Sequence, residues 1–207
     1  MTVTQTVSQP LQPTWKQPSH PDTIKVRSSN TLASNSNTDA ASFHLTATAN
    51  RDIPANTLLA KNTSTTLAST KDYSTVQISP TLHIRLNSDL LYCNHSCDPN
   101  VRFVTSTLQP DETRKKTAGS SNQAPAEPSV AGAIEVWSTR DISAGEELRF
   151  FYPSTEWEMA QPFDCSCGAE KCLGRIDGAK NLPTEVLERY WLSDHIKSLL
   201  AARDGLN

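Results

Sequence analysis

Five cysteines are the residues of this 207-residue chain whose type and spacing are best suited to chemistry. Three of them, Cys165, Cys167 and Cys172, form the pattern CxCx4C, and Cys97 ends the motif NHSC far upstream. Zinc prefers four sulfur or nitrogen ligands in a tetrahedron, and a shell of four thiolates leaves no open position for catalysis. These four residues therefore predict a structural zinc site that ties two distant segments together.

Two other states of the four thiols are also compatible with the sequence. They could form two disulfides, or they could stay reduced and unrelated to one another. The N-terminal residues MTVTQTVSQPLQP lack the apolar core of a secretory signal, and no apolar stretch approaches the roughly 18 residues of a membrane helix. We therefore expect no membrane association and a location in the cytoplasm or nucleus, where thiols remain reduced. Cys93, the fifth cysteine, is expected to be a small buried hydrophobe.

The charge balance of the chain argues against nucleic acid as a direct partner. The formal net charge is −3, and the longest basic run is Arg114-Lys115-Lys116. Proteins that wrap nucleic acid carry a basic surface that neutralises phosphates. Hydrophobic residues make up only 36% of the chain, which is low for a protein that is packed throughout. We expect a monomer with one domain of ordinary size and flexible additions.

Short segments of alternating polar and apolar residues, bounded by Pro, Asn, Asp or Gly, predict a mostly β fold. Convincing helices come only at the end, over Thr184–Trp191 and after Ser193, which can cap a helix that stops near Gly205. Two tracts, Ser28–Ala41 and Ser106–Val130, are too polar for the core, and the second resembles a surface loop. The predicted strands are Thr23–Arg27, His44–Thr48, Thr57–Lys61, Ser74–Ser79, His83–Leu86, Val101–Thr105, Ala133–Ser138 and Glu147–Tyr152.

Three motifs in a fixed order carry a family resemblance. NHSCDPN at Asn94–Asn100, AGEELRFFY at Ala144–Tyr152 and the CxCx4C segment resemble the SET and post-SET elements of the SET-domain methyltransferases, most closely the small stand-alone SET proteins. The resemblance implies an α+β, mostly β fold of several small curved sheets with a pseudoknot. Composition, periodicity and the resemblance together predict four segments, which are a flexible N-terminal segment (1–22), a SET-like domain (23–160, with a surface loop at 106–130), a post-SET zinc segment (161–180) and C-terminal helices (181–207).

The resemblance implies a role for individual residues. In the family, the residues that correspond to Asn94 and His95 contact S-adenosylmethionine, and the tyrosine at the position of Tyr152 is catalytic. Cys97 would join the three later cysteines around one zinc ion. Leu173, just after the last cysteine, is a candidate to pack on the cofactor. The residues alone leave simpler interpretations open, because Tyr152 could be a buried strand aromatic and Asn94 and His95 a structural pair.

The implied reaction suits these residue types. Transfer of a methyl group from a sulfonium to an amine needs in-line approach and a neutral nucleophile, yet a lysine side chain has a pKa of roughly 10.4. A dry pocket that disfavours the charged amine would help, and a neutral tyrosine hydroxyl can orient the nitrogen. The resemblance therefore implies an S-adenosylmethionine-dependent methyltransferase, with a protein lysine as the default acceptor.

The chain also departs from the family pattern. The family binds the methionine part of its cofactor with a GxG turn, but no glycine occurs here before Gly119. The two glycines would fall near His44 and Thr46, whose side chains hinder a close backbone approach. In the next turn Asn56 stands in place of glycine and tolerates a positive φ.

These departures leave two further functions open. A SET-like, zinc-stapled protein without cofactor binding could act as an interaction scaffold, which the missing glycines favour. A SET fold could also be recruited to a small-molecule biosynthetic reaction. The short segment between Lys61 and Cys93 leaves little room for the family's substrate-selecting insert and would open the acceptor side.

Overall fold

A computed structural model of the chain describes residues 13–31, 42–107 and 132–205, and most of their regular structure is short strands in five small sheets. The expected mostly β fold class is confirmed. The strands are β1 (Ile24–Thr31), β2 (Ser42–Ala49), β3 (Leu58–Asn62), β4 (Thr66–Leu67), β5 (Thr75–Gln77), β6 (His83–Arg85), β7 (Asn94–His95), β8 (Val101–Thr107), β9 (Gly132–Ser138), β10 (Arg149–Phe150), β11 (Phe163–Asp164) and β12 (Arg175–Ile176). The helices are α1 (Thr184–Leu187) and α2 (Asp194–Arg203), with 3-10 turns at Asp89–Tyr92, Tyr152–Ser154 and Ala179–Asn181.

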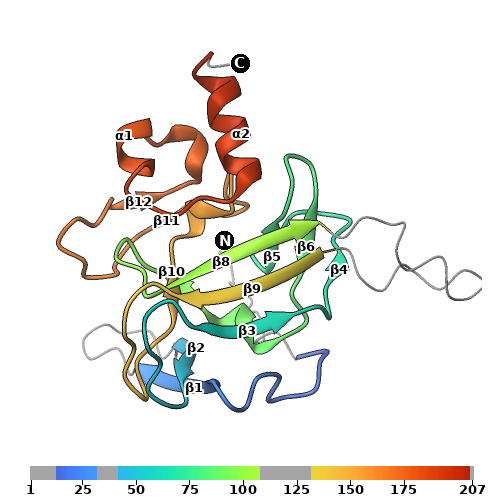
Figure 1. The fold of residues 1–207 in the computed structure, drawn as a ribbon, viewed down its shortest axis with the longest axis vertical. Helices are drawn as coiled ribbons and strands as arrows, with labels where there is room; N and C mark the ends of the chain where they lie inside the picture. The colour runs from blue at the N-terminus through green and yellow to red at the C-terminus, as the bar shows by residue number, and fades with distance from the viewer. Residues whose placement is uncertain (1–12, 32–41, 108–131, 206–207) are drawn as a thin grey trace, which may run out of the picture.

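Three regions follow one another along the long axis of the molecule (Figure 1). The antiparallel sheet β3-β9-β8 crosses the middle. The antiparallel pair β1-β2 lies at one end, and α1, α2 and the pair β11-β12 lie at the other. The helices therefore lie beyond the β8 edge of the central sheet, and the β1-β2 pair lies beyond its β3 edge.

Alternation of side chains along β10 connects two hydrophobic clusters. Phe150 stacks on Phe103 of β8 with ring centroids 4.0 Å apart, next to the buried Val136 of β9. Because neighbouring side chains of an extended segment point to opposite sides, Phe151 enters a second cluster and Tyr152 packs against the first. The second cluster consists of Phe151, Ala179, Leu187, Leu192, Ile196 and Leu200. Tyr152 is thus held at the boundary between the two clusters.

Every predicted strand overlaps an observed one, but the segment Glu147–Tyr152 is mostly not a strand. Only Arg149 and Phe150 pair, and Tyr152 begins a 3-10 turn. Pro153 follows directly and has no N–H to donate, so an extended ladder cannot continue there. The predictions missed β4, β7, β11 and β12, because a strand of two residues shows no alternation.

The polar tracts and the first turn also differ in detail from expectation. Ser28–Thr31 continues β1, since its backbone pairs with Ser42–Leu45 of β2 whatever the side-chain polarity. Most of the predicted loop at 106–130 lies outside the described residues, and its first two residues extend β8. Asn56 has a φ of 56°, which confirms that it serves in the turn where the family has glycine.

Ser193 occupies the N-cap position of α2, but its side chain makes no capping hydrogen bond, so this part of the helix prediction is wrong. The hydroxyl is buried and has no partner among the described residues, and the backbone N–H of Ser193 donates instead to the carbonyl of Ser154 at 3.0 Å. Packing against the Tyr152–Ser154 turn therefore decides the orientation of this residue. The predicted helix Thr184–Trp191 is regular only as far as Leu187.

Asp89 holds the described part of the N-terminal segment. Its carboxylate accepts hydrogen bonds from Trp15 Nε1 (2.9 Å), Gln17 Nε2 (2.7 Å) and the backbone N–H of Ser19 (2.7 Å). Burial opposes the charge of Asp89, but these bonds outweigh it and hold the pKa of the carboxyl below its ordinary value. The sequence predicts a flexible segment over 1–22, whereas residues 13–22 make specific contacts. The boundaries of the four expected segments remain predictions.

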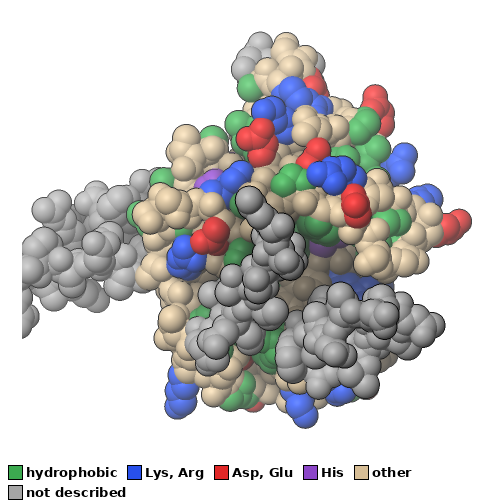
Figure 2. Space-filling model, turned by 180° about the vertical axis from the view of Figure 1, so that it is seen from behind, with side chains coloured by type: hydrophobic (Ala, Val, Ile, Leu, Met, Phe, Trp, Pro, Cys, Tyr) green, Lys and Arg blue, Asp and Glu red, His purple; other side chains and the backbone are tan. Residues whose placement is uncertain are grey.

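On the face that Figure 2 shows, Lys and Arg side chains are interspersed with Asp and Glu side chains over the described residues. The ion pairs include Lys61–Glu135 (3.0 Å) and Arg140–Glu146 (2.7 Å). This mixed surface agrees with the small net charge of the chain. Among the described residues, no helix is long and apolar enough to cross a membrane.

We expect Asp89→Asn to lower the free energy of unfolding by about 2 kcal/mol, because an amide accepts weaker hydrogen bonds than a buried carboxylate and adds donors of its own. Urea unfolding would measure the change, and trypsin should cut more readily after Lys16. Asp22→Asn, at an exposed position in the same segment, serves as the control. Equal trypsin sensitivity of the two variants would show that Asp89 does not hold the segment.

Candidate active site and metal centre

A short parallel strand pair brings Asn94 and His95 to Tyr152. In the β7–β10 pair, His95 lies opposite Phe150. The backbone N–H of Ser96 then donates to the carbonyl of Phe150 at 3.1 Å. Segments more than fifty residues apart in the sequence are therefore held in one register, two residues from the tyrosine.

Asn100 secures this crossing with its side chain. The Nδ2 group donates to Glu146 Oε1 (2.9 Å) and to the carbonyl of Glu147 (2.8 Å). The Oδ1 atom accepts from the backbone N–H of Arg149 at 2.9 Å. Asn100 is 3% exposed, so these bonds satisfy a buried amide that would otherwise be costly. The last residue of NHSCDPN thus has a structural function.

The ring of His95 connects Tyr152 to Cys97. Nδ1 accepts a hydrogen bond from the backbone N–H of Tyr152 at 3.2 Å, and Nε2 lies 3.3 Å from Cys97 Sγ. Burial lowers the pKa of His95 to about 4, so the ring is neutral at pH 7. Since Nδ1 accepts, the single ring proton is on Nε2 and points to the sulfur. His95 therefore positions the backbone of Tyr152 relative to the cysteine cluster.

Asn94, His95 and Tyr152 share one cleft, which we call the Asn94 cleft. It has a volume of about 500 Å³. Asn94 is half-buried, and its Nδ2 donates to Glu147 Oε1 at 2.8 Å. The lining residues are Thr46, Asn94, His95, Glu147, Arg149, Tyr152, Phe163, Asp164, Cys165, Ser166 and Cys167. The volume falls in the range of pockets that bind small ligands.

Thr46 borders the Asn94 cleft at one of the two positions where the family has glycine. It lies in the regular part of β2, opposite Arg27 of β1. The strand predicted over His44–Thr48 is thus observed where the family has its GxG turn, and the β-branched residue Thr46 borders the cleft. A ligand here would meet the side chain of Thr46 rather than bare backbone.

Several residues of the cleft were not found from the sequence, Phe163 among them. The Phe163 ring lies 6.0 Å from that of Tyr152 and 5.7 Å from that of His95, edge-on to both. One signal was available, because Phe163 stands two residues before Cys165 and alternation of a short strand would point both the same way.

Leu173, which was a candidate to pack on the cofactor, does not line the cleft. It packs against the second hydrophobic cluster.

Four cysteines meet beside the Asn94 cleft. The Sγ atoms of Cys97, Cys165, Cys167 and Cys172 all lie within 4.8 Å of one another, and those of Cys97 and Cys165 are 4.0 Å apart. Sulfurs in a tetrahedron around zinc, each roughly 2.3 Å from the ion, are about 3.8 Å apart. The cysteines are free thiols rather than disulfides. The donor set therefore fits a zinc ion with small adjustments, and four sulfurs make such a site structural.

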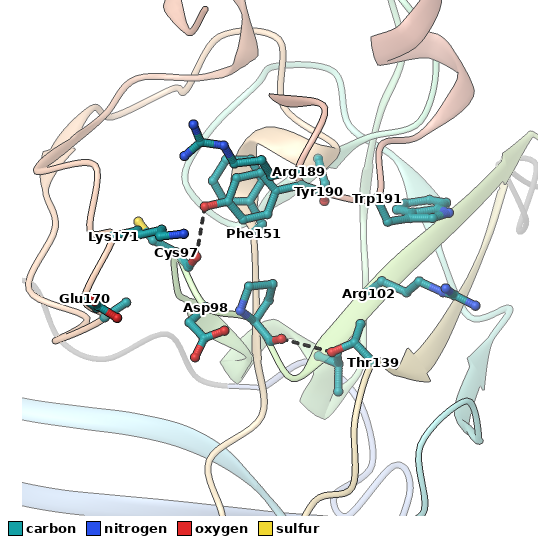
Figure 3. A pocket seen from close by; sticks show the side chains of 14 residues that line it. Cys97, Asp98, Arg102, Thr139, Phe151, Glu170, Lys171, Arg189, Tyr190 and Trp191 are labelled. Atoms are coloured by element: carbon teal, nitrogen blue, oxygen red, sulfur yellow. Dashed lines mark hydrogen bonds between the residues drawn. The ribbon is translucent and has the colours of Figure 1, made fainter. Parts of the chain in front are cut away.

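The C-terminal region also contacts Cys97, through Tyr190 (Figure 3). The hydroxyl of Tyr190 donates to the carbonyl of Cys97 at 2.9 Å, and its ring stacks on Phe151 at 3.7 Å. The backbone N–H of Leu173 lies 3.4 Å from Cys97 Sγ, where it can donate to a thiolate. The position of Cys97 thus depends on elements on both sides of the cluster.

A wider groove of about 580 Å³ also borders Cys97 but does not contain Asn94, His95 or Tyr152. Figure 3 shows side chains of both signs around it. The cations are Arg102, Lys171 and Arg189, and the acids are Asp98 and Glu170. The size of this groove does not make it the reaction site, because the residues with family roles lie elsewhere.

Tyr152 also lines a second cavity, which we call the Glu156 cavity. It is narrow, with about 50 Å³ of free space, and its walls include Val76, Leu90 and Phe103. The Tyr152 hydroxyl donates to the carbonyl of Cys93 at 3.2 Å. Burial raises the pKa of the phenol above its ordinary value, with smaller contributions from nearby acidic groups, so the hydroxyl stays protonated. A neutral tyrosine therefore separates two cavities of different character.

Glu156 is the most deeply buried acid of this second cavity. Its Oε1 accepts hydrogen bonds from the backbone N–H of Gln77 (2.8 Å) and from Thr155 Oγ1 (3.3 Å). Burial raises the pKa of Glu156 to about 7 in spite of these bonds. Sequence analysis did not identify Glu156, since nothing in its spacing distinguishes it from a surface acid.

We expect one zinc ion per chain, and Cys97→Ser should lower the metal content as much as Cys172→Ser does. Each change removes one of four ligands, although the two residues lie in different segments. Atomic absorption of purified protein would measure the content. Cys93→Ser, which changes the cysteine outside the cluster, should keep the zinc. Full occupancy in Cys97→Ser would exclude Cys97 as a ligand.

Because Glu156 is buried, we expect the free energy of unfolding to fall as the pH rises. The folded protein gives this carboxyl a pKa of about 7, against the ordinary 4.5. Between these values the folded state holds a proton that the unfolded state has lost, so the free energy of unfolding falls as the pH rises, and the loss is complete above about pH 7. We expect Glu156→Gln to remove about 2.5 kcal/mol of this decline between about pH 5 and about pH 8.

Urea unfolding of the zinc-loaded proteins at a series of pH values would test this expectation. The titratable neighbours Lys71 and His83 remain in the variant, so the difference between the two profiles reports the titration of Glu156 together with its coupling to them. Glu158→Gln alters an exposed acid of the same segment and should keep the wild-type profile. Parallel profiles for the wild type and Glu156→Gln would show that the carboxyl titrates normally.

Comparison with known proteins agrees with this geometry. A family model described as SET domain matches residues 44–153. Methyltransferase flvH of Aspergillus flavus is 40% identical over 191 residues, which are 92% of this chain and 88% of that protein. An H3 lysine-36 specific histone-lysine N-methyltransferase of Chaetomium globosum is 31% identical over 109 residues, 50% of this chain and 10% of that protein.

A third relative, histone-lysine N-methyltransferase mes-4 of Caenorhabditis elegans, is 34% identical over 90 residues, 43% of this chain and 8% of that protein. The histone-lysine enzymes thus share only a part of this chain, and that part is a small fraction of their own length. The family model extends over β2, β7 and β10, which supply one part of the Asn94 cleft, and the match to flvH takes in 92% of the chain. The chain therefore belongs to the SET-domain methyltransferase family.

Proposed function

We propose that this protein transfers the methyl group of S-adenosylmethionine to an amine nitrogen, with Tyr152 as the catalytic residue. One observation carries the proposal, which is that the side chain of Tyr152 lines both the Asn94 cleft and the Glu156 cavity. A methyl donor in one cavity and a methyl acceptor in the other would meet at this residue. The pairing of a larger cleft of about 500 Å³ with a narrow cavity of about 50 Å³ supports that division.

The Asn94 cleft is the proposed cofactor site. When bound, S-adenosylmethionine supplies an electrophilic methyl group on a sulfonium centre. Glu147, Asp164 and Arg149 border the cleft, so its lining offers partners of both signs for the ammonium and carboxylate groups of the cofactor's methionine part, while Asn94 can offer amide contacts. Phe163 adds an apolar face beside Tyr152. The buried His95 acts through the position of Tyr152.

The Tyr152 hydroxyl is arranged to orient an amine. Its proton is committed to the carbonyl of Cys93, so its oxygen is left as an acceptor. An amine that donates an N–H to this oxygen keeps its own lone pair free for reaction. The phenol stays neutral and does not hold the amine as an ammonium ion. Alignment and desolvation are the main contributions that the protein makes.

A protein lysine is the default acceptor. The names of the two histone-lysine relatives support it, although each is matched by no more than half of this chain. A small-molecule amine is the second candidate. The short segment between β3 and Cys93 favours this candidate, because its strands have only two or three residues and leave little room for a substrate-selecting insert. The narrow Glu156 cavity is then the acceptor side.

We expect S-adenosylmethionine to stabilise the zinc-loaded protein by about 2.7 kcal/mol at 100 times its dissociation constant. Tyr152→Phe should keep this stabilisation, because the ring remains, but lower the rate of methyl transfer by about 100-fold through misalignment. Mass spectrometry would detect the added CH2 unit on proteins and, in a separate arm, on small amines. Wild-type protein without a thermal shift or product would favour the scaffold function, for which Thr46 in the cleft is the supporting observation.

A further inference from the structure

The Glu156 cavity contains two carboxylates in different situations. Asp72 is fully compensated, since it accepts from Arg85 Nη2 (2.7 Å), the backbone N–H of Ser74 (2.8 Å) and Ser74 Oγ (2.6 Å). These bonds overcome the effect of burial and lower the pKa of Asp72 below its ordinary value. Its charge is therefore already balanced by the protein.

The charge of Glu156 is not balanced in this way. Its side chain is only 9% exposed. Both of its hydrogen bonds reach Oε1, and within the part of the chain that the structure describes none reaches Oε2. The side chain of Glu156 lines the cavity together with Tyr152. A largely buried carboxylate with one oxygen at a cavity wall and no donor to it is costly, so the site favours a ligand that supplies one.

The basic neighbours of Glu156 do not supply that donor. His83 Nε2 lies 3.8 Å from Oε2, but burial lowers the pKa of His83, so this is a contact with a neutral ring. The Lys71 ammonium lies at an exposed position and donates to the carbonyl of Glu158 at 2.7 Å. Around the cavity, the apolar side chains Val76 and Leu90 provide a medium of low polarity.

We propose that Glu156 is a specificity-determining residue, whose Oε2 selects acceptors that arrive with a positively charged amine and binds that group in the cavity beside Tyr152. The bound ammonium group then gives one proton to Oε2, which leaves the neutral amine that methyl transfer requires. This inference rests on the proposed function for the identity of the cavity as the acceptor side. An ammonium group offers three donors and a charge, and an ion pair is stronger in a medium of low polarity than in water. A neutral alcohol of the same shape gains only a hydrogen bond.

Binding of two matched probes, n-pentylammonium and 1-pentanol, tests the proposal without the cofactor. Ligand-observed NMR titrations at about pH 8 would give the dissociation constants for zinc-loaded protein, at a pH where Glu156 is ionised. We expect the wild type to bind n-pentylammonium at least about tenfold more tightly than 1-pentanol, since a hydrogen bond to a charged group contributes that much. In Glu156→Gln the ratio should fall to within about twofold.

Glu158→Gln is the matched control, because Glu158 stands two residues away, is 51% exposed and pairs with Lys180. It should keep the wild-type ratio. Zinc content and urea unfolding establish that Glu156→Gln is folded. A wild type that does not prefer n-pentylammonium, or a preference that persists in Glu156→Gln, would overturn the proposal. A preference that depends on Glu156 in a protein that does not bind S-adenosylmethionine would uphold the cation site and reject the methyltransferase function.

Discussion

The pairing of β7 with β10 is the constraint on which the rest of the structure depends. Two residues of parallel strand are weak by themselves, since such a pair offers few hydrogen bonds. The crossing is secured by side chains, with Asn100 bonded to the backbone of β10 and His95 bonded to the backbone of Tyr152. The cysteine cluster lies directly behind His95. A zinc ion in that cluster would stabilise the crossing and the tail together, because its ligands come from both.

Strand alternation makes this crossing the proposed reaction site. Phe150 and Phe151 enter two different hydrophobic clusters, so the chain between them cannot rotate. Tyr152 is therefore fixed at the boundary, with a cavity on each side. The 3-10 turn that Pro153 imposes then directs the chain to Glu156. One continuous stretch of seven residues supplies core packing, the proposed catalytic hydroxyl and the proposed cation selector.

Burial acts in opposite directions on the groups around this stretch. It keeps Tyr152 protonated and His95 neutral, which suits residues that position other groups by hydrogen bonds. The same burial makes the charge of Glu156 costly and raises its pKa to about 7. A cation that enters the cavity would offset this cost. The geometry thus combines neutral alignment at Tyr152 with charge selection at Glu156.

The sequence by itself determined the mostly β class, the strands with alternating residues and the motifs that meet at Tyr152, because these features depend on local patterns and on residue type. Only the tertiary structure decided the two-residue strands, the unpartnered hydroxyl of Ser193 and the place of Leu173 in the second cluster. The tertiary structure alone also identified Phe163 and Glu156 as residues that line the two cavities. Their importance arises from which cavity they face and how deeply they are buried, and both depend on contacts between segments far apart in the chain.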